Sequence, residues 1–510
     1  MMQNHLQKLR PDTIILFFLA CGLLLRVVVH LVTGFIVDDA YITFRFAAQI
    51  AAGNGFVFNT GEPIYGTTTP LFTLLLAGWR LLTQSEILTG AFLLNLAASL
   101  AAVVFAWMAL RSLGATSAQQ LFVVALLMFS QRTVFAEIKG MESAWVVLFM
   151  MASLWAAATG RMSLAGVFCG LLLWTRPDTF VWIFALVFMA GRSGIRQAAQ
   201  VLLVCGLVYL PWVIFATWYF GSPIPHTITA KWVAYLQFNA DPISGQVSIV
   251  LDYLSPTSFP FGFFSMNVLA WLTVLICGWQ GWRAVGNRWL NVLSIFALLE
   301  ILRLIITKAT FFTHYLYPAM WVVLLILGLG LGSLYDILSK KRTLYRVIFS
   351  MLLLLLFAMN VMALVDGINI RKEDQSIREE AALKGMGLWL NQNTSPDAVV
   401  LLEPLGYVGY YADRRMIDEV GLITPGIVEM KRNSIHDVYQ YIAAYQVDYV
   451  IAQCDEAQRW LERSAEGEIS FAQDFSLSKR FDPLSFDPAQ ERPNQQLARD
   501  ACYEIWGRND

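Results

Sequence analysis

Long apolar runs separated by short polar segments dominate the first 366 residues. A helix needs about 20 predominantly apolar residues to cross a bilayer, and most of these runs approach that length. The pattern predicts eleven spans, at about 13–35, 88–110, 119–136, 143–159, 163–175, 177–191, 197–219, 259–282, 289–307, 312–333 and 344–366. We therefore expect a polytopic α-helical membrane protein.

One further apolar run does not fit this series. Pro70–Thr83 is 14 residues long and contains Arg80. It is too short and too charged to cross easily, so it predicts an interfacial helix lying on the membrane.

The positions of the basic residues test that choice, because cytoplasmic loops collect Lys and Arg. With eleven spans and an inside N-terminus, every inside loop is basic. These loops hold Arg111, Arg161, Arg192, Arg196, Arg283, Arg288, Lys340, Lys341, Arg342 and Arg346, and the N-terminal segment holds Lys8 and Arg10. Three long stretches then face outward: 36–87, 220–258 and everything after about 367. We expect this orientation in a bacterial inner membrane, with the C-terminal domain periplasmic.

Composition changes abruptly at the last predicted span. The whole chain is 57% hydrophobic and 14% charged, with a net charge of −1. Up to Asp366 there are 21 Lys and Arg against 13 Asp and Glu, or +8, whereas the remaining 15 and 24 give −9. These figures exclude a nucleic-acid-binding domain and an ordinary cytosolic enzyme. They predict a membrane module at 1–366 and a water-exposed domain at 367–510.

The tail shows alternating strand and helix signals, which predict a small α/β domain. Residues 398–402 and 448–453 are short β-favouring runs, and 435–445 is helix-like after the candidate caps Asn433 and Ser434. The polar segment at 462–500 is expected to be loop-rich. Cys454 and Cys502 lie in this domain, where a disulfide and two free thiols are equal alternatives.

An acidic pair, Asp38-Asp39, directly follows the first predicted span. Two adjacent carboxylates at a membrane boundary are costly to desolvate, and their repulsion should raise at least one pKa. That suits a general base or a metal-binding group, whereas the alternative is a hydrated pair that ends the span. The turn-rich stretch that follows, 53–70, is too long for a simple connector.

The stretch DDAYITFRFAAQIAAGNGFVFNTGEPIYGTTTPLF resembles the first external loop of GT-C glycosyltransferases, especially the terminal arabinofuranosyltransferases of mycobacterial cell walls. The resemblance continues in consistent order over most of the chain, with two departures: Met141, where relatives often have Leu, and His226, where relatives often have Asn. Its further motifs are Gly140-Met141-Glu142-Ser143, Thr175-Arg176-Pro177-Asp178, Pro225-His226-Thr227 with Lys231, Leu405-Gly406-Tyr407, and Asp418-Glu419-Val420-Gly421-Leu422. The resemblance implies transfer, with inversion, of a sugar from a polyprenyl-phosphate donor at the outer membrane face.

The resemblance also implies roles for named residues. An aspartate of the first loop is the base, which maps to Asp38 or Asp39. Outward cations would stabilise the departing phosphate, with Glu142 assisting. The candidate cations are Arg45, Arg176, His226 and Lys231. Each has a structural alternative: Arg176 could pair with Asp178, Glu142 could cap the next span, Lys231 could snorkel, His226 could be an ordinary loop residue, and Arg45 could form a pair elsewhere.

Three hypotheses follow for function. The first is a glycosyltransferase with membrane lipids and a glycan, lipid or protein acceptor as its partners. The second is a transporter or flippase of a lipid-linked or polar solute, which should show intramembrane charges and repeat symmetry. The third is a non-catalytic assembly subunit. A metal, Mg or Mn held by Asp38 and Asp39, stays open, as does the identity of the sugar.

Overall fold

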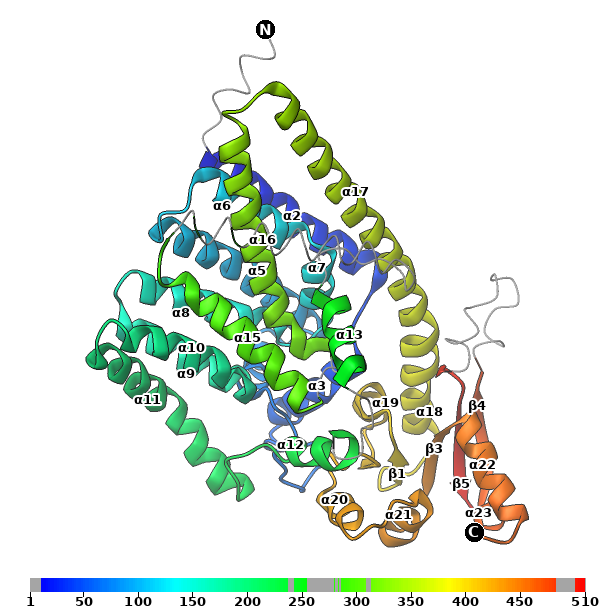
Figure 1. Ribbon diagram of the computed structural model, residues 1–510. Coiled ribbons are helices and arrows are strands. Elements are labelled where there is room, and N and C mark those ends of the chain that lie inside the picture. Colours follow the sequence, from blue (N-terminus) through cyan, green and yellow to red (C-terminus); the bar gives the residue numbers. More distant parts are fainter. Residues whose placement is uncertain are drawn as a thin grey trace. The chain divides into compact units, whose positions relative to one another are not determined.

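The computed structural model describes residues 11–236, 243–254, 279, 283, 286–308, 313–482 and 500–509. This part of the chain is mostly helical, with a mixed β-sheet near the C-terminus (Figure 1). Its contacts define two compact units. Unit 1 contains 1–32, 92–211 and 240–368, and unit 2 contains 33–91, 212–239 and 369–510. Unit 2 therefore combines the tail with much of 36–87 and 220–258, the first two stretches that are predicted to face outward. The division at 366/367, which concerns membrane exposure, stays a prediction.

Helices occupy the predicted spans wherever these are described. They are α2 (Pro11–Thr33), α5 (Ile87–Ser112), α6 (Ser117–Phe129), α7 (Gln131–Ile138), α8 (Ser143–Ala158), α9 (Met162–Thr175), η1 (Pro177–Thr179), α10 (Phe180–Gly191), α11 (Ile195–Phe220), α15 (Leu290–Ile306), η3 (Thr313–Leu316), α16 (Tyr317–Leu338) and α17 (Thr343–Asp374). Another helix of unit 1, α13 (Ile243–Leu254), was not expected.

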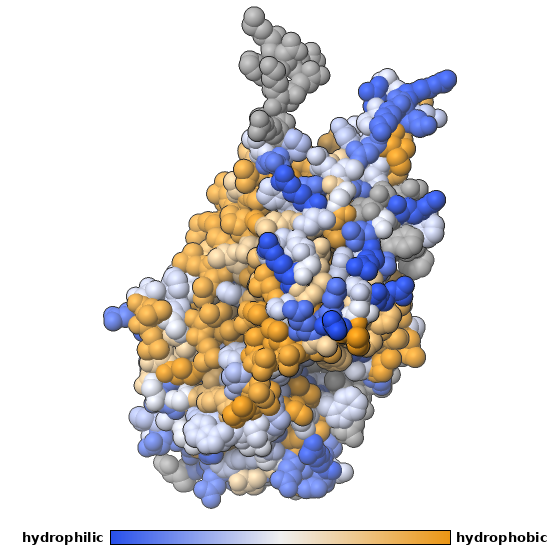
Figure 2. Space-filling model, turned by 90° about the vertical axis from the view of Figure 1, so that its left-hand side faces the viewer, coloured by the Kyte–Doolittle hydropathy of each residue, from blue (hydrophilic) through white to orange (hydrophobic). Residues whose placement is uncertain are grey.

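Five of the described helices are long and apolar enough to cross a membrane, or six if the bent pair α6 and α7 counts as one span. The protein is therefore a multi-span membrane protein. The span expected at 259–282 falls almost entirely outside the described residues, so the total of eleven stays a prediction. Figure 2 shows hydrophobic residues over much of the visible surface, as expected for a surface in contact with lipid tails. Exposed apolar side chains on long helices include Phe17, Leu203 and Leu354.

Glycines allow α6 and α16 to pack closely in unit 1. A Cβ atom at Gly328 would lie 2.7 Å from Val123 Cα, and one at Gly332 would lie 2.4 Å from Gln119 Cα. The two glycines are four residues apart and share one face of α16. Small residues at this spacing are a common device for bringing membrane helices together, because no hydrophobic effect drives helices together within lipid.

A buried ion pair stabilises the break between α6 and α7, which are bent by 51° at Ser130. Arg26 is fully buried, and its guanidinium lies 2.6 Å from the Glu137 carboxylate. It also donates to the carbonyl oxygens of Met128 at 2.7 Å and Leu127 at 3.2 Å. At the bend, these carbonyl oxygens lack the N–H donors that a continuous helix would provide. A carbonyl oxygen without a donor inside the membrane costs free energy, so the guanidinium stabilises the bend. Tyr317 donates to the other Glu137 oxygen at 2.6 Å, so both oxygens of this carboxylate have partners.

In unit 2, the outer segments form helices of their own. They are α3 (Asp38–Ala51), α4 (Pro70–Thr83), α12 (His226–Lys231) and η2 (Trp232–Leu236). The bounds of α4 agree with those predicted for the interfacial helix, whereas α3 was not specified in advance. After residue 368 follow the end of α17, η4 (Gln375–Lys384) and α18 (Gly385–Asn393).

The tail folds as a mixed α/β domain around a five-stranded sheet of order β2-β1-β3-β5-β4. The strands are β1 (Val399–Leu402), β2 (Arg415–Asp418), β3 (Tyr449–Gln453), β4 (Phe475–Phe481) and β5 (Tyr503–Arg508). The helices are α19 (Leu405–Ala412), α20 (Pro425–Arg432), α21 (Val438–Tyr445), α22 (Cys454–Ala465) and α23 (Phe471–Asp474). β1 pairs in parallel with β2 and β3, and β5 runs antiparallel to β3 and β4. The predicted strands at 398–402 and 448–453 are confirmed as β1 and β3.

Two predictions for the tail were wrong. The helix expected from 435 begins at Val438 and is capped by Asp437, whose carboxylate accepts a hydrogen bond from the Tyr439 N–H. Ser434 has φ of +64°, a left-handed conformation that does not suit an N-cap. The segment from 462 also contains β4, whose side chains are buried only at its two ends, so it lacks an apolar signal.

Cys454 and Cys502 form a disulfide, the first of the two alternatives. The bond links residues 48 positions apart and joins the start of α22 to the residue before β5. Replacing both cysteines by Ser is expected to lower the stability of the tail by about 2–4 kcal/mol, because the unfolded chain gains conformational freedom. Susceptibility of the tail to limited proteolysis at increasing urea concentrations measures this. Cys21→Ser, at a free cysteine in α2, is the control and should cause no comparable loss.

Candidate functional site

Asp38 joins the first outer segment to the C-terminal domain within unit 2. Its carboxylate accepts hydrogen bonds from the backbone N–H groups of Gly406 at 3.0 Å and Tyr407 at 2.7 Å. These groups belong to the first turn of α19, where unpaired N–H groups and the helix dipole favour a carboxylate. A Cβ at position 406 would lie 1.9 Å from the Asp38 carbonyl oxygen, so this approach requires glycine. Burial raises the pKa of Asp38 to about 6, although the two N–H groups oppose that shift.

Asp39 differs from its neighbour in exposure and in hydrogen bonding. Its side chain is exposed, and it makes no hydrogen bond or ion pair with any residue that the structure describes. It lies in the first turn of α3, where a negative charge is favourable. The sequence left the two aspartates equivalent as candidate bases. The structure separates a carboxylate engaged in capping from one that is available to a substrate.

Both aspartates line a cavity of about 570 Å³ in unit 2. This volume falls within the range of about 300–1,000 Å³ that is typical of small-molecule sites. One side is formed by the chain just before and within α3, and the other by the end of α17 and η4. The lining residues are Phe35, Val37, Asp38, Asp39, Ile370, Arg371, Glu373, Asp374, Arg378 and Glu379. The second group was not predicted, because nothing in the sequence brings 370–379 next to 35–39.

The rest of the first outer segment is bound to β2. The Asn59 amide donates to the Met416 carbonyl oxygen at 2.9 Å and accepts from the Met416 N–H at 3.0 Å. Glu62 lies 2.6 Å from Arg415 in an ion pair. The Asn-Thr-Gly-Glu part of the motif thus serves to attach this segment to the sheet.

Arg45 is buried and makes contacts that are structural. It is only 4% exposed, and it donates to the carbonyl oxygens of Phe58 at 2.9 Å and Arg414 at 2.8 Å. Its guanidinium lies over the Phe58 ring at 4.6 Å. These contacts point to a residue that fixes the loop and the tail, and they give no support to the expected phosphate contact.

His226 and Lys231 begin and end the short helix α12. The backbone N–H of His226 donates to the Tyr65 carbonyl oxygen at 2.9 Å, which ties the middle segment to the first. Burial lowers the pKa of His226, so its imidazole is mostly neutral at pH 7 and is poorly suited to act as a cation. Lys231 is half-buried in the last turn. Both residues belong to unit 2, as do Asp38, Asp39 and Arg45.

Glu142 and Arg176 come together in unit 1. Arg176 donates to Glu142 at 2.8 Å and makes two parallel hydrogen bonds to Asp178, each at 2.9 Å. Arg303, which lies 2.6 Å from Glu300, is also 3.7 Å from Asp178. The Glu142 side chain makes no capping bond to α8, and the pairing of Arg176 with Asp178 matches the structural alternative expected from the sequence.

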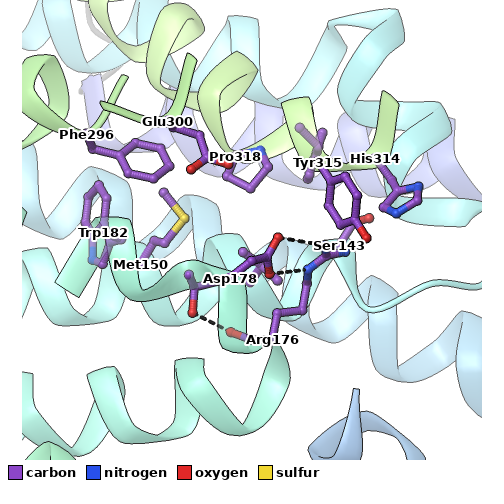
Figure 3. A pocket seen from close by; sticks show the side chains of 13 residues that line it. Ser143, Met150, Arg176, Asp178, Trp182, Phe296, Glu300, His314, Tyr315 and Pro318 are labelled. Atoms are coloured by element: carbon purple, nitrogen blue, oxygen red, sulfur yellow. Dashed lines mark hydrogen bonds and ion pairs between the residues drawn. The ribbon is translucent and has the colours of Figure 1, made fainter. Parts of the chain in front are cut away.

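Figure 3 shows Arg176, Asp178 and Glu300 of this cluster beside a small cavity that is lined by residues of α8, α10, α15 and α16. The cavity measures about 20 Å³, enough for roughly one water molecule. The five charged side chains comprise two arginines and three carboxylates, so no positive charge is in excess. Charged groups among membrane helices are rare and usually functional, which keeps this cluster a candidate. Its carboxylates would nevertheless compete with any phosphate for Arg176.

A second group of carboxylates, also missed from the sequence, lies where strands of the sheet end. Glu403 follows β1, Glu419 follows β2, and Glu456 is in the first turn of α22 after β3. Burial and the charges of Glu456 and Glu403 raise the pKa of Glu419 to about 8, although Lys431 opposes the shift. Oε1 of Glu419 is buried and has no hydrogen-bond partner. The carboxyl ends of parallel strands meet at one edge, which explains the clustering.

This arrangement predicts a pH-dependent stability. The pKa of Glu419 is raised in the folded protein from the ordinary 4.5. The stability that protonated Glu419 gives the folded protein is therefore fully present below about pH 4.5 and is lost as the pH rises through about 8. Glu419→Gln should therefore leave Tm nearly unchanged at pH 5 and raise it by about 5 °C at pH 8.5. Thermal unfolding at both pH values measures this, with the exposed Glu429→Gln as the control. An equal shift at both pH values would contradict the prediction.

The described residues include no group of three or more His, Cys, Asp or Glu side chains placed to hold one metal ion. Asp38 and Asp39 therefore lack a third protein ligand in this part of the chain. Asp38 is also committed to the N–H groups of α19. The residues present do not fit a divalent metal site built on the acidic pair.

Comparisons with known proteins agree on the fold. Residues 369–506 match the family described as Domain of unknown function (DUF8728). No curated protein matches the chain at a significant level. ArnT from Cupriavidus metallidurans bound to undecaprenyl phosphate superposes with a TM-score of 0.61 at 13% identity, over 96% of this chain and 97% of ArnT. The apo state of ArnT gives 0.56 at 14% identity, with the same coverage.

The archaeal oligosaccharyltransferase AglB from Archaeoglobus fulgidus, in complex with an inhibitory peptide and a dolichol-phosphate, gives 0.54 at 13% identity. That match covers 86% of this chain and 69% of AglB. The fold of this chain is therefore that of the GT-C glycosyltransferases ArnT and AglB. Identity this low shows the fold alone, and none of these matches concerns the arabinofuranosyltransferase branch.

Proposed function

We propose that this protein is a membrane glycosyltransferase. It moves a sugar from a polyprenyl-phosphate donor to a glycan, lipid or protein acceptor, with inversion at the anomeric carbon. The observation that carries this proposal is an exposed, unpaired Asp39 in a cavity of about 570 Å³, in a chain with the fold of ArnT and AglB.

Asp39 acts as the general base. Its carboxylate accepts the proton of the acceptor hydroxyl while that oxygen forms a bond to the anomeric carbon. The bond between the anomeric carbon and the phosphate oxygen breaks, and the electron pair leaves with the polyprenyl phosphate. A carboxylate that is bound to neither a cation nor an N–H group keeps its lone pairs available for this proton. Asp38, one residue earlier, positions α3 by capping α19.

Lys231 is the cation of unit 2 that we propose for the departing phosphate, because Arg45 donates to carbonyl oxygens and the pKa of His226 is lowered. The Arg176 and Glu142 pair of unit 1 is a second candidate for contact with the donor. ArnT was solved with undecaprenyl phosphate and AglB with dolichol-phosphate, which supports a polyprenyl-phosphate donor here.

We place the protein in the cytoplasmic membrane of a bacterium, with inside loops basic and the tail on the outer face. The excess of Lys and Arg in those loops supports this orientation. A pentose such as arabinose is proposed as the sugar only from the resemblance of the first outer segment.

A direct test starts from the purified protein in lipid nanodiscs with a polyprenyl-phosphate sugar and a hydroxyl acceptor. Mass spectrometry should detect the glycosylated acceptor and free polyprenyl phosphate in equal amounts. The rival, a transporter or flippase, predicts movement of the intact lipid-linked sugar across liposomes with no glycosylated product. That result would overturn the proposed function.

A further inference from the structure

The described residues that line the cavity at Asp39 include more acidic than basic side chains. Its lining includes five carboxylates and two guanidinium groups. Arg378 lies between two of these carboxylates, 3.9 Å from Asp374 and 3.6 Å from Glu379, and neither contact is short. The other guanidinium, Arg371, lies over the Phe35 ring at 5.0 Å. A concave, partly apolar site that is lined mainly by acidic side chains favours cationic ligands.

One carboxylate in this lining has an unused acceptor. Glu379 is only 3% exposed, and its Oε2 atom has no hydrogen-bond partner among the described residues. A buried carboxylate oxygen without a donor costs free energy, and a ligand that brings a donor recovers it. Glu379 lies on η4, a ten-residue stretch of π-helix, and such stretches are frequent at functional sites.

Two features define the ligand. The phosphate of the donor is anionic and is disfavoured by a lining in which acidic side chains outnumber basic ones, so this cavity faces the acceptor. A single metal ion does not fill about 570 Å³, and no three carboxylates of the described chain converge on one point. The class of ligand that remains is an organic molecule with a positive charge and several hydrogen-bond donors.

We infer that this cavity recognises an acceptor through a protonated amine, which binds between Glu379 and the neighbouring carboxylates while a hydroxyl of the same acceptor reaches Asp39. This inference rests on the proposed function, since it assigns the substrate class of the same site. It requires no additional group-transfer step, because the amine only positions the acceptor.

The inference can be tested by binding alone, without any donor. Three probes share one ring: methyl β-D-glucosaminide carries the ammonium, its N-acetyl derivative is neutral, and methyl β-D-glucoside has a hydroxyl. Affinities are measured by saturation-transfer NMR with the full chain in nanodiscs of uncharged phosphatidylcholine. The glucosaminide should bind at least about tenfold more tightly than the other two, and added salt should reduce this preference.

Variants locate the effect. Glu379→Gln should remove most of the amine preference and leave the neutral probes unaffected. The matched control is Glu380→Gln, one residue along, whose carboxylate is exposed, pairs with Lys384 and does not line the cavity. If Glu379→Gln does not fold, the half-buried Glu373→Gln in the same lining replaces it.

Equal affinity for the three probes would overturn the inference. So would an amine preference that survives in Glu379→Gln, or in Glu373→Gln where that variant replaces it. Saturable binding of Mg²⁺ alone, without any amine preference, would also overturn the inference. A different result would contradict the proposed function. If the protein binds the amine probe selectively but forms no glycosylated product, glycosyl transfer is contradicted while amine recognition by this cavity stands.

Discussion

Asp39→Asn is expected to reduce sugar transfer by about 10²–10⁴-fold, the usual contribution of a positioned general base. The amide keeps the shape of the side chain but cannot accept the acceptor proton. Because Asp39 makes no hydrogen bond or ion pair with the described residues, its replacement should lower Tm only slightly, through the lost charge in the first turn of α3. The rate is measured as polyprenyl phosphate released per folded protein, in nanodiscs with saturating acceptor.

Asp38→Asn is the matched control, one residue away. Its side chain caps α19, and the amide replaces only part of that acceptor capacity, so this variant should lose about 1 kcal/mol of stability. Its transfer rate per folded molecule should fall less than that of Asp39→Asn. A normal rate in Asp39→Asn with a severe loss in Asp38→Asn would move the base to Asp38. Normal rates in both variants would remove the base from this pair.

Arg26→Met is expected to destabilise unit 1 by about 3–5 kcal/mol, because it leaves the Glu137 carboxylate buried without its cation. The carbonyl oxygen of Met128 at the break between α6 and α7 loses the Arg26 donor as well, whereas that of Leu127 keeps the Thr133 hydroxyl. Thermal unfolding in detergent, followed by size-exclusion chromatography with fluorescence detection, measures the loss.

The exposed pair Arg111 and Asp12, at 3.7 Å in the same unit, provides the control. Arg111→Met should change stability little, since exposed pairs contribute little. The double variant Arg26→Met with Glu137→Leu should be less destabilised than Arg26→Met alone, because the unpaired charge is gone. A small effect of Arg26→Met would mean that water or another cation replaces the guanidinium.

The sequence predicted helices far better than the contacts between them. Apolar runs locate membrane helices because lipid demands continuous hydrophobic surface, so α2, α5 and α11 begin and end within a few residues of the predicted spans. The strand β4 was missed because only its ends are buried, and an exposed edge strand carries no apolar signal. The role of Arg26 was missed because its partners lie about 100 residues away along the chain.

The candidate site was only partly predictable for the same reason. Asp38 and Asp39 belong to one short motif, so the pair can be recognised directly from the sequence. Which of them is available depends on the N–H groups of Gly406 and Tyr407, more than 360 residues later. Arg45 had the right charge for a phosphate, but its burial against carbonyl oxygens of the Phe58 loop is a tertiary property.

The attachment of Asn59 to β2 has a consequence for where this protein can be cut. β2 is an outer strand of the sheet, and Asn59 occupies the N–H and carbonyl of Met416 on its free side. A fragment that begins at residue 369 would carry the whole sheet but lose this cover. Uncovered strand edges recruit other chains, so that fragment should self-associate in solution, and a soluble version of the tail would need the 53–66 segment supplied with it.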